Sequence, residues 1–194
     1  ADNGPEKYEE YSAVIVDETE KMAGMINTLL DLSALEAGAA PLKAEQFDLV
    51  ELVETVAGRE FVDMDMLGFQ LEYTLPDVPM VVMADPVRLR QVLHNFMGNA
   101  KKFTRPGGRI HIGLETTSNS ARFFIYNDGV TLSKGETEAI WRKFQRSKST
   151  ANAAGSGLGL TISAQILASM GAGYGVRNQG EGVEFFFTLP QVIE

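Results

Sequence analysis

The sequence predicts an α+β protein: a two-layer α/β sandwich with helices on one face of a mixed sheet, preceded by a long N-terminal helix. Apolar residues recur at three- and four-residue intervals from Pro5 to about Glu36, which indicates a helix. After Glu45, helical patterns alternate with runs of period two, and two pairs of such runs resemble hairpins. Helices interspersed with strands and hairpins favour helices packed on a sheet.

Composition limits what the chain can be. Its 194 residues suffice for one hydrophobic core plus a helical appendage. It contains no cysteine, which excludes disulfides and thiolate metal sites and is typical of a cytoplasmic domain. The formal net charge of −9 argues against a general nucleic-acid binder, so any anion site must be built locally. No apolar run approaches the roughly eighteen residues that a membrane helix requires.

The N-terminal helix carries an apolar seam, and its members alternate at three- and four-residue spacing with one glutamate among them: Tyr8, Tyr11, Ile15, Glu18, Met22, Met25, Leu29 and Leu32. Ile26 and Leu30 widen this stripe beyond a two-stranded seam. The helix either packs on its own domain or forms one arm of a dimeric four-helix bundle, and we favour the bundle.

A boundary follows the helix. Gly38–Pro41 is typical of a linker, so we expect residues 1–40 and residues 41–194 to form separate parts. Glu45–Leu49 predicts a short strand and the start of a helix, with Asp48 as its N-cap.

Several later runs predict strands. Phe69–Leu75 alternates between apolar and polar residues, as a half-buried strand does, and Met80–Met83 predicts a short apolar strand. Residues 110–114 and 121–126 predict two central strands, and a closing hairpin is expected around residues 176–189.

The stretch from Asp85 to Thr104 predicts a helix with a polar face. Asp85 suits the N-cap, and Pro86 suits the first helical position. An apolar stripe recurs at four- and three-residue spacing and consists of Val92, Phe96, Ala100 and Phe103. A polar set with the same spacing shares the neighbouring face and consists of Asn95, Asn99 and Lys102.

A glycine-rich run, Gly155-Ser156-Gly157-Leu158-Gly159-Leu160, stands directly before the helical pattern Thr161–Met170. Glycines let a backbone close on a ligand, and the start of a helix offers unpaired N–H groups to an anion. A basic cluster of Arg142, Lys143, Arg146 and Lys148 precedes the run, although such clusters are more often solvated loops. The polar helix face and the glycine-rich run together predict a site for a nucleotide phosphate and its metal ion.

These two motifs resemble the ATP-binding catalytic domain of sensor histidine kinases, within the superfamily shared with gyrase and mismatch-repair ATPases. The resemblance covers about Glu45 to Leu189, and Leu32–Gly38 is similar to the end of the family's preceding helix. That helix is the second helix of a dimerisation and phosphotransfer hairpin. The first helix normally carries the phospho-accepting histidine, but that motif is absent, and we expect His94 and His111 to be structural. The chain therefore resembles part of a longer sensor.

The resemblance implies roles for the polar helix face. Asn99 would hold the Mg²⁺ that bridges the ATP phosphates, Lys102 would neutralise phosphate charge, and Phe103 would pack near the adenine. Asn95 stands where gyrase-like relatives have a glutamate that activates water. Because an amide lacks that basicity, we expect transfer to a side chain rather than efficient ATP hydrolysis.

A lid is implied from about Gln145 to Ser156, with Trp141 and Phe144 in the places of two phenylalanines that anchor it. Without the resemblance, these two aromatic residues would be core residues at helical spacing. The full set implied for the nucleotide is Asn95, Asn99, Lys102, Phe103, Asn127, Gly129, Phe144, Arg146, Gly155, Gly157, Leu158, Gly159 and Leu160, with Asn95 and Lys102 catalytic and Asn99 the metal ligand.

One motif departs from the family, which has Asp-x-Gly-x-Gly after the second central strand and uses the aspartate to accept from the adenine amine. Asn127 stands in the aspartate position, and Thr131 replaces the second glycine. A neutral acceptor is worth roughly 0.5–1.5 rather than about 1.5–3 kcal/mol, which is about tenfold in affinity. A positive φ at Thr131 would strain a β-branched residue. Using Asp128 instead would move the carboxylate to the other strand face.

The resemblance implies the catalytic portion of a protein-histidine kinase. It would bind ATP and Mg²⁺, transfer the γ-phosphoryl group to a histidine absent from this chain, and signal to a response regulator receiver domain. We expect a homodimer in the full-length protein, a cytoplasmic location, a membrane link only through a sensor region outside this chain, and no autophosphorylation by this chain alone. Two alternatives stay open: a degenerate module that binds nucleotide weakly and docks a partner, and a chaperone- or gyrase-like ATPase, which Asn95 disfavours.

Overall fold

The computed structural model describes residues 5–38, 41–62, 68–145 and 157–192. The chain divides into two compact units, Ala1–Ala40 and Pro41–Glu194, and each is considered by itself. The first unit consists of α1 (Pro5–Glu36). None of the described helices is both long and apolar enough to cross a membrane.

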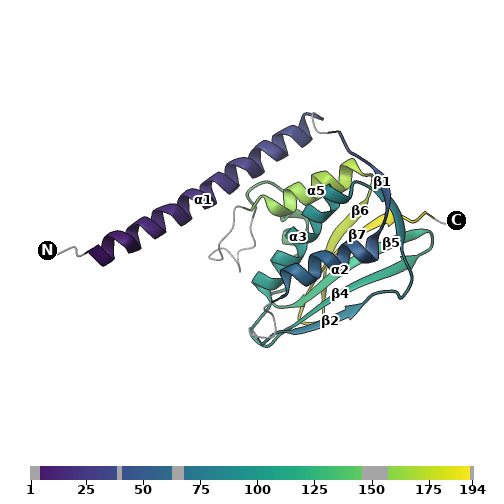
Figure 1. Cartoon of the computed structure of the whole chain (residues 1–194). Helices are drawn as coiled ribbons and strands as arrows, with labels where there is room; N and C mark the ends of the chain where they lie inside the picture. Colours follow the sequence, from purple (N-terminus) through teal and green to yellow (C-terminus); the bar gives the residue numbers. More distant parts are fainter. Residues whose placement is uncertain (1–4, 39–40, 63–67, 146–156, 193–194) are drawn as a thin grey trace. The chain divides into compact units, whose positions relative to one another are not determined.

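α1 has the long N-terminal extent that its apolar periodicity predicts (Figure 1). Taken by itself, the helix exposes seam residues such as Tyr8, Ile15 and Met22. The Thr19 hydroxyl donates to the Ile15 carbonyl at 2.7 Å, so this polar side chain is accommodated within the helix. Most helical stability in proteins comes from packing an apolar face, and the first unit supplies no cover for this one.

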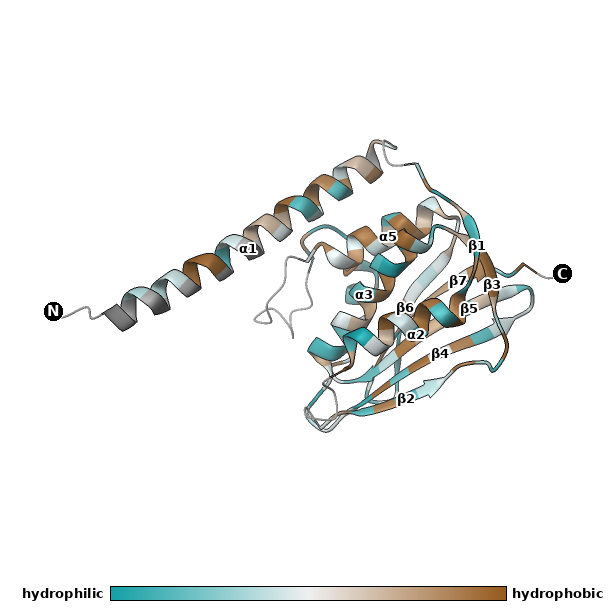
Figure 2. Ribbon diagram, viewed as in Figure 1, coloured by the Kyte–Doolittle hydropathy of each residue, from teal (hydrophilic) through white to brown (hydrophobic). Residues whose placement is uncertain are grey.

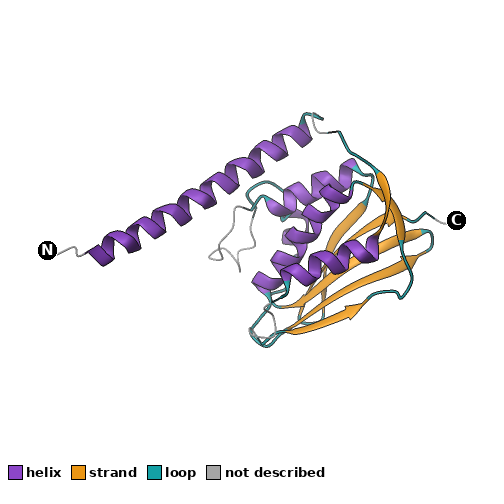
Figure 3. Ribbon diagram, in the orientation of Figure 1, coloured by secondary structure: helices purple, strands orange, loops and turns teal. Residues whose placement is uncertain are grey.

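The second unit is a two-layer sandwich, which confirms the predicted fold class. Its five-stranded sheet has the order β2 (Gln70–Thr74), β4 (Arg109–Thr117), β5 (Ser120–Asp128), β7 (Gly182–Pro190), β6 (Gly173–Gln179). β2 is parallel to β4 and the other neighbours are antiparallel, so the sheet is mixed. Figures 1 and 3 show one face covered by α2 (Leu49–Glu60), α3 (Pro86–Phe103) and α5 (Gly159–Ser169).

Two short elements complete the second unit. A two-stranded antiparallel sheet pairs β1 (Glu45–Asp48) with β3 (Val81–Ala84). α4 (Lys134–Ala139) follows β5.

The core lies between the helices and the sheet. Along β5 the side chains alternate, and Phe123 points to the helical side, where it stacks on Phe187 of β7 at 5.0 Å. Phe187 in turn lies 6.5 Å from Phe96 of α3, measured between ring centroids. α5 is buried over most of its length and is largely apolar (Figure 2). The opposite face of the sheet, here called the open face, carries Arg122, Tyr126 and other even-numbered residues of β5.

Local capping places the first two helices of the second unit. Asp48 accepts from the backbone N–H of Val50 and of Met80, both at 2.9 Å, so the predicted N-cap also ties α2 to the segment before β3. Asp85 caps α3 by accepting from Val87 N–H at 3.0 Å and Arg88 N–H at 3.1 Å.

The structure differs from the sequence predictions at three places. α4 was not predicted, although Ser133 and Glu136 form a capping box that marks its start. β5 continues to Asp128, so Asn127 belongs to the strand and not to the turn after it. α5 begins at Gly159, two residues before the periodic pattern Thr161–Met170 and within Leu158–Leu160, where the resemblance implies the start of the helix.

Asp85 links the position of α3 to pH. Burial by itself would raise the pKa of its carboxyl, but N–H groups of Lys43, Arg88 and Val87 donate to it and, with the Arg88 charge, hold the pKa below the ordinary value of 3.8. A lowered pKa means that the charged carboxylate stabilises the fold above pH 3.8 and that this contribution is lost as the pH falls through the folded-state pKa.

We therefore expect Asp85→Asn to lower the free energy of unfolding at pH 7 by about 1–2 kcal/mol. The difference between variant and wild type should close as the pH falls below 3.8, because wild type then loses the same charge. Urea denaturation at several pH values measures both effects. Asp77→Asn, in the exposed loop between β2 and β3, is the control, and a pH-independent difference for Asp85→Asn would contradict the assignment.

Candidate functional site

The polar face of α3 and the glycine-rich run meet at the start of α5. The Asn95 side-chain nitrogen donates to the Gly159 carbonyl at 3.1 Å and lies 3.2 Å from the Ser163 hydroxyl oxygen. The Ser163 hydroxyl also donates to the Gly159 carbonyl, at 3.0 Å. Asn95 Oδ1 would lie 3.1 Å from a Cβ on Gly159, so the glycine lets the two helices approach. Two motifs that are 64 residues apart in sequence therefore form one site.

The other end of α3 meets the end of β5. Thr104, the C-cap of α3, forms a bridge with Gly129. A side chain on Gly129 would collide with the Phe103 carbonyl oxygen and would lie 3.2 Å from the Asn127 side-chain nitrogen. Phe103, Asn127 and Gly129, all members of the set implied for the nucleotide, are thus brought together.

Asn127 is 2% exposed and points to the helical side of the sheet, as Phe123 and Ile125 do. Its side-chain nitrogen lies 3.5 Å from the backbone carbonyl oxygen of Asp128, a long contact for a hydrogen bond.

Thr131 does not carry the strain that a positive φ would impose. Within the described residues, the non-glycine residues with positive φ are Ser118 and Phe144. The turn after β5 therefore accommodates a β-branched residue where the related families have glycine.

Asn99 and Lys102 occupy the polar face of α3 between these two ends. Asn99 is half-buried one helical turn after Asn95, and Lys102 is exposed. The Lys102 ammonium lies 4.8 Å from the centre of the Phe103 ring. Helical spacing thus places an amide and a cation between the glycine-rich run and the Phe103 end.

The glycine-rich run is described from Gly157 onward; Arg146, Gly155 and the remainder of the expected lid lie outside the described residues. Gly157 has φ +70°, and a Cβ there would lie 3.3 Å from the Phe144 Cα. Leu158 is buried and precedes α5, and Leu160 is half-buried in its first turn.

The two aromatic residues ahead of the expected lid behave differently. Trp141 packs on Phe96, Tyr174 and Phe185, with ring-centroid distances of 6.2, 5.0 and 5.9 Å. Phe144 is 65% exposed with φ +58°, so the alternative that both are core residues at helical spacing is wrong for Phe144. A positive φ is not a helical backbone conformation, so the helical spacing on which that alternative rested does not hold at Phe144.

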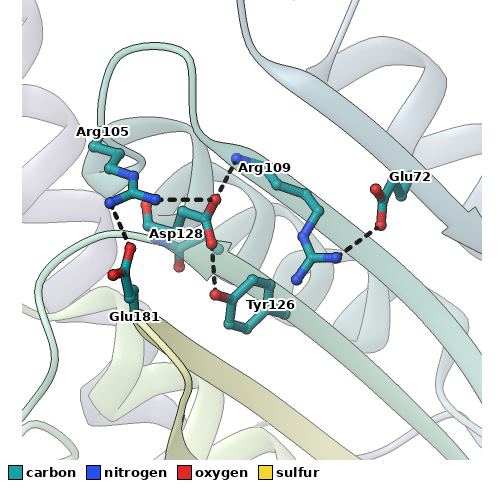
Figure 4. A network of polar contacts seen from close by, with 7 residues as sticks. Glu72, Arg105, Arg109, Tyr126, Asp128 and Glu181 are labelled. Carbon is teal, nitrogen blue, oxygen red and sulfur yellow. Dashed lines mark hydrogen bonds and ion pairs between the residues drawn. The ribbon is translucent and has the colours of Figure 1, made fainter.

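A polar network on the open face was missed in the sequence. Asp128 accepts from the Tyr126 hydroxyl at 2.5 Å and from the Arg109 backbone N–H at 3.0 Å, and it lies 3.8 Å from an Arg105 nitrogen (Figure 4). Arg105 also pairs with Glu181 at 2.8 Å. The partners lie on four separate segments, so no local pattern could reveal the network.

The groups around the Asp128 carboxyl lower its pKa. Burial by itself would raise its pKa, but the Tyr126 hydroxyl, the Arg109 N–H and the charges of Arg105 and Arg109 outweigh burial and lower it. Conversely, burial and the bond to Asp128 raise the pKa of Tyr126. Asp128 is therefore a carboxylate that this network engages on the open face, whereas Asn127 faces the helices.

The histidines have structural partners. His94 Nδ1 lies 2.5 Å from a Glu60 carboxylate oxygen, and His111 Nε2 lies 2.8 Å from the Thr74 hydroxyl.

The site residues are chemically suited to a metal-bound nucleotide. No cluster of three or more histidine, cysteine, aspartate or glutamate side chains that could hold a metal occurs among the described residues. Magnesium often keeps several waters and is shared with phosphate oxygens, so a single neutral oxygen donor such as Asn99 fits that donor set. Gly129 and Gly159 let the Phe103 carbonyl and the Asn95 side chain approach closely, which fixes the two ends of α3 against the rest of the site.

Comparison with known proteins identifies the family. Residues 84–193 match the family described as histidine kinase-, DNA gyrase B-, and HSP90-like ATPase. The chain is 30% identical to the circadian input-output histidine kinase CikA of Synechococcus elongatus over 191 residues, covering 96% of this chain and 25% of CikA. It is 32% identical to the sensor protein GacS of Pseudomonas syringae over 190 residues, covering 93% of this chain and 21% of GacS.

A solved structure agrees over the whole chain. Full-length ShkA, crystallised in complex with AMPPNP, matches with a TM-score of 0.84 at 26% identity, covering 100% of this chain and 41% of ShkA. The chain spans about a quarter or less of the curated relatives named above.

The contact between Gly129 and Phe103 yields a stability test. Gly129→Ala should lower the free energy of unfolding by about 1–3 kcal/mol, because the new methyl group overpacks the space beside the Phe103 carbonyl. Gly135→Ala in α4 is the matched control: no atom lies within 4 Å of its Cβ, and it should raise stability by about 0.5–1 kcal/mol. Thermal and urea denaturation compare the two, and equal effects would contradict the close approach.

Proposed function

Because the chain belongs to the family of histidine kinase-, DNA gyrase B- and HSP90-like ATPases, we propose that its second unit binds ATP with Mg²⁺ and transfers the γ-phosphoryl group to a protein histidine. The observation that supports this most directly is the pair of contacts from Asn95 to Gly159 and Ser163, which joins the two motifs. The acceptor is a histidine other than His94 and His111, whose imidazoles contact Glu60 and Thr74.

The base would lie at the Phe103 end of α3. Asn127 would offer an amide oxygen to the adenine amine, and Gly129 lets the end of β5 lie directly against the Phe103 carbonyl. Phe103 supplies an apolar edge, and Phe144 is exposed enough to cover a ligand from the start of the lid.

The phosphates would lie between α3 and the start of α5. Among the described residues no side chain caps the N-terminus of α5, and the first N–H groups of a helix are suited to bind an anion. Lys102 adds a positive charge, and the lid residues Arg146 and Gly155 complete the proposed set. Asn99 would hold Mg²⁺, which neutralises phosphate charge when bound.

Transfer rather than hydrolysis fits the residues present. Phosphoryl transfer depends mostly on positioning and charge neutralisation, which an amide, a lysine and a helix N-terminus supply. Asn95 has no basicity, and its amide nitrogen contacts Gly159 and Ser163. The arrangement therefore suits a kinase better than an ATPase that activates water.

Partners follow from the relatives and from α1. The curated relatives are named histidine kinases and a sensor protein, so we propose a response regulator receiver domain as the downstream partner. The seam of α1, which is exposed from Tyr8 to Leu29, supports its assignment to the second helix of a dimerisation hairpin within residues 1–40, and hence a homodimer of the full-length protein. We place the chain in the cytoplasm, in keeping with its lack of cysteine.

One observation favours a second function, a degenerate module that acts by docking a partner. Asn127 replaces the carboxylate that the related kinases use for adenine. The relaxed backbone at Thr131 removes the other sign of degeneration. Nucleotide affinity separates the two functions.

Calorimetric titration with ADP and an ATP analogue, with and without Mg²⁺, tests the proposed site. We expect magnesium-enhanced binding, and Lys102→Ala should weaken it about tenfold, because a bond between charged groups is lost. Lys134→Ala, which removes an exposed lysine at the start of α4, is the control and should leave affinity unchanged. Absence of binding up to millimolar nucleotide by wild type and by Asn127→Asp would exclude the site.

Asn127→Asp should have opposite effects on stability and affinity. A buried carboxylate without the amide's donor should lower the free energy of unfolding by about 1–3 kcal/mol. The charged acceptor should raise affinity for ATP about tenfold. Denaturation and calorimetry measure the two quantities. A variant that binds ATP no better than wild type would show that Asn127 does not contact the base.

A further inference from the structure

Asp128 lies between two residues that are assigned to the base, but its own side chain points away from the base. Asn127 and Gly129 would contact the base, and Asp128 stands between them with its side chain on the open face. Whatever fixes Asp128 therefore also fixes the backbone on which Asn127 and Gly129 are mounted.

Asp128 is held from three directions. Its carboxylate accepts from the Tyr126 hydroxyl at 2.5 Å on its own strand and from the Arg109 N–H at 3.0 Å on β4. Its backbone carbonyl accepts from the Arg105 N–H at 3.0 Å. Arg105 directly follows Thr104, the C-cap of α3, so Asp128 fixes the end of β5 against the end of α3.

Glu181 closes the arrangement from the turn between β6 and β7. Its carboxylate accepts from Arg105 Nη1 at 2.8 Å, and its backbone carbonyl accepts from the Gly129 N–H at 3.0 Å. Figure 4 shows Arg105 between Asp128 and Glu181. We name Tyr126, Asp128, Arg105 and Glu181 the base-side network.

Burial distinguishes the members of the base-side network. The Asp128 side chain is 17% exposed, whereas those of Arg105 and Glu181 are 54% and 76% exposed. An ion pair between exposed groups contributes little, so Asp128 is the member whose charge matters most.

We propose that Asp128 is a positioning residue for the purine base: from the open face it sets the height of Asn127 and Gly129 against α3. The inference rests on the proposed function and deepens it, because it separates recognition of the base from recognition of the phosphates. The phosphates would be bound at the start of α5, and no described contact of Asp128 reaches that helix.

Comparing two ligands tests this separation. ATP engages both ends of the site, whereas inorganic tripolyphosphate engages only the phosphate end. Calorimetric affinities for both, with Mg²⁺, are measured on the whole chain as wild type, Asp128→Asn and Tyr126→Phe. Asp128→Asn removes the charge at nearly constant size, and Tyr126→Phe removes one hydrogen bond to the same carboxylate.

Glu115→Gln is the matched control. Glu115 pairs with Arg122 at 3.2 Å on the same face, at the opposite end of β4. It loses the same charge without touching the end of β5.

We expect Asp128→Asn to weaken ATP binding about tenfold, while the affinity for tripolyphosphate changes less than about twofold, because only the base end of the site is displaced. Tyr126→Phe should weaken ATP in the same direction by less, and Glu115→Gln should change neither ligand. An equal loss of affinity for both ligands, or an unchanged ratio of the two affinities, would overturn the positioning role and leave the proposed function intact. If Asp128→Asn does not fold, Tyr126→Phe decides by the same ratio. Wild type that binds neither ligand would overturn the proposed function itself.

Discussion

Phe96 holds α3 on the sheet. Its ring lies 5.5 Å from Phe185 and 6.5 Å from Phe187 of β7, and 6.2 Å from Trp141, so one side chain joins the helix, a central strand and the segment before the lid. Aromatic packing of this kind adds to the large area that each ring buries. Asn95 precedes Phe96 directly, so the ring that fixes the helix also fixes the face on which the site is built. A shift of α3 would displace its contacts with Gly159 and Gly129 together.

The second constraint is the alternation of β5. Successive side chains point to opposite faces, so Asn127 and Asp128 meet different surroundings although they are neighbours. Asn127 faces the helices and is buried, which an uncharged amide tolerates better than a carboxylate would. Asp128 faces away from them and is surrounded by Arg105, Arg109 and Tyr126, which keep it charged. The strand thus places a neutral group on the helical face and a charged one directly behind it.

The sequence predicted what local rules determine. Asp85 and Pro86 predicted the start of α3, and alternating apolar and polar residues predicted the strands, because capping and periodicity depend on near neighbours. The capping box of Ser133 and Glu136 is equally local, so the start of α4 was predictable in the same way. The positions of Asn95, Asn99 and Lys102 on one face of α3 also followed from spacing.

Other features depend on contacts that sequence spacing does not encode. Ser163 was not predicted as a partner of Asn95, because 68 residues separate them and only the packing of α3 on α5 brings them together. Glu181 and Arg105 are 76 residues apart and lie outside the helices, on segments whose relative placement comes from the sheet order. The exposure of Phe144 follows from a positive φ, which its residue type does not suggest.

The contacts of Asn95 bear on hydrolysis beyond the missing basicity. Its amide nitrogen faces the Gly159 carbonyl oxygen and the Ser163 hydroxyl oxygen. A glutamate carboxylate directed there would place an acceptor against the Gly159 carbonyl, which also accepts from Ser163. To accommodate such a base, α5 would have to move or the side chain would have to turn away. The same asparagine therefore lacks the basicity to activate water and also contacts the start of the helix whose N-terminus would receive the phosphates.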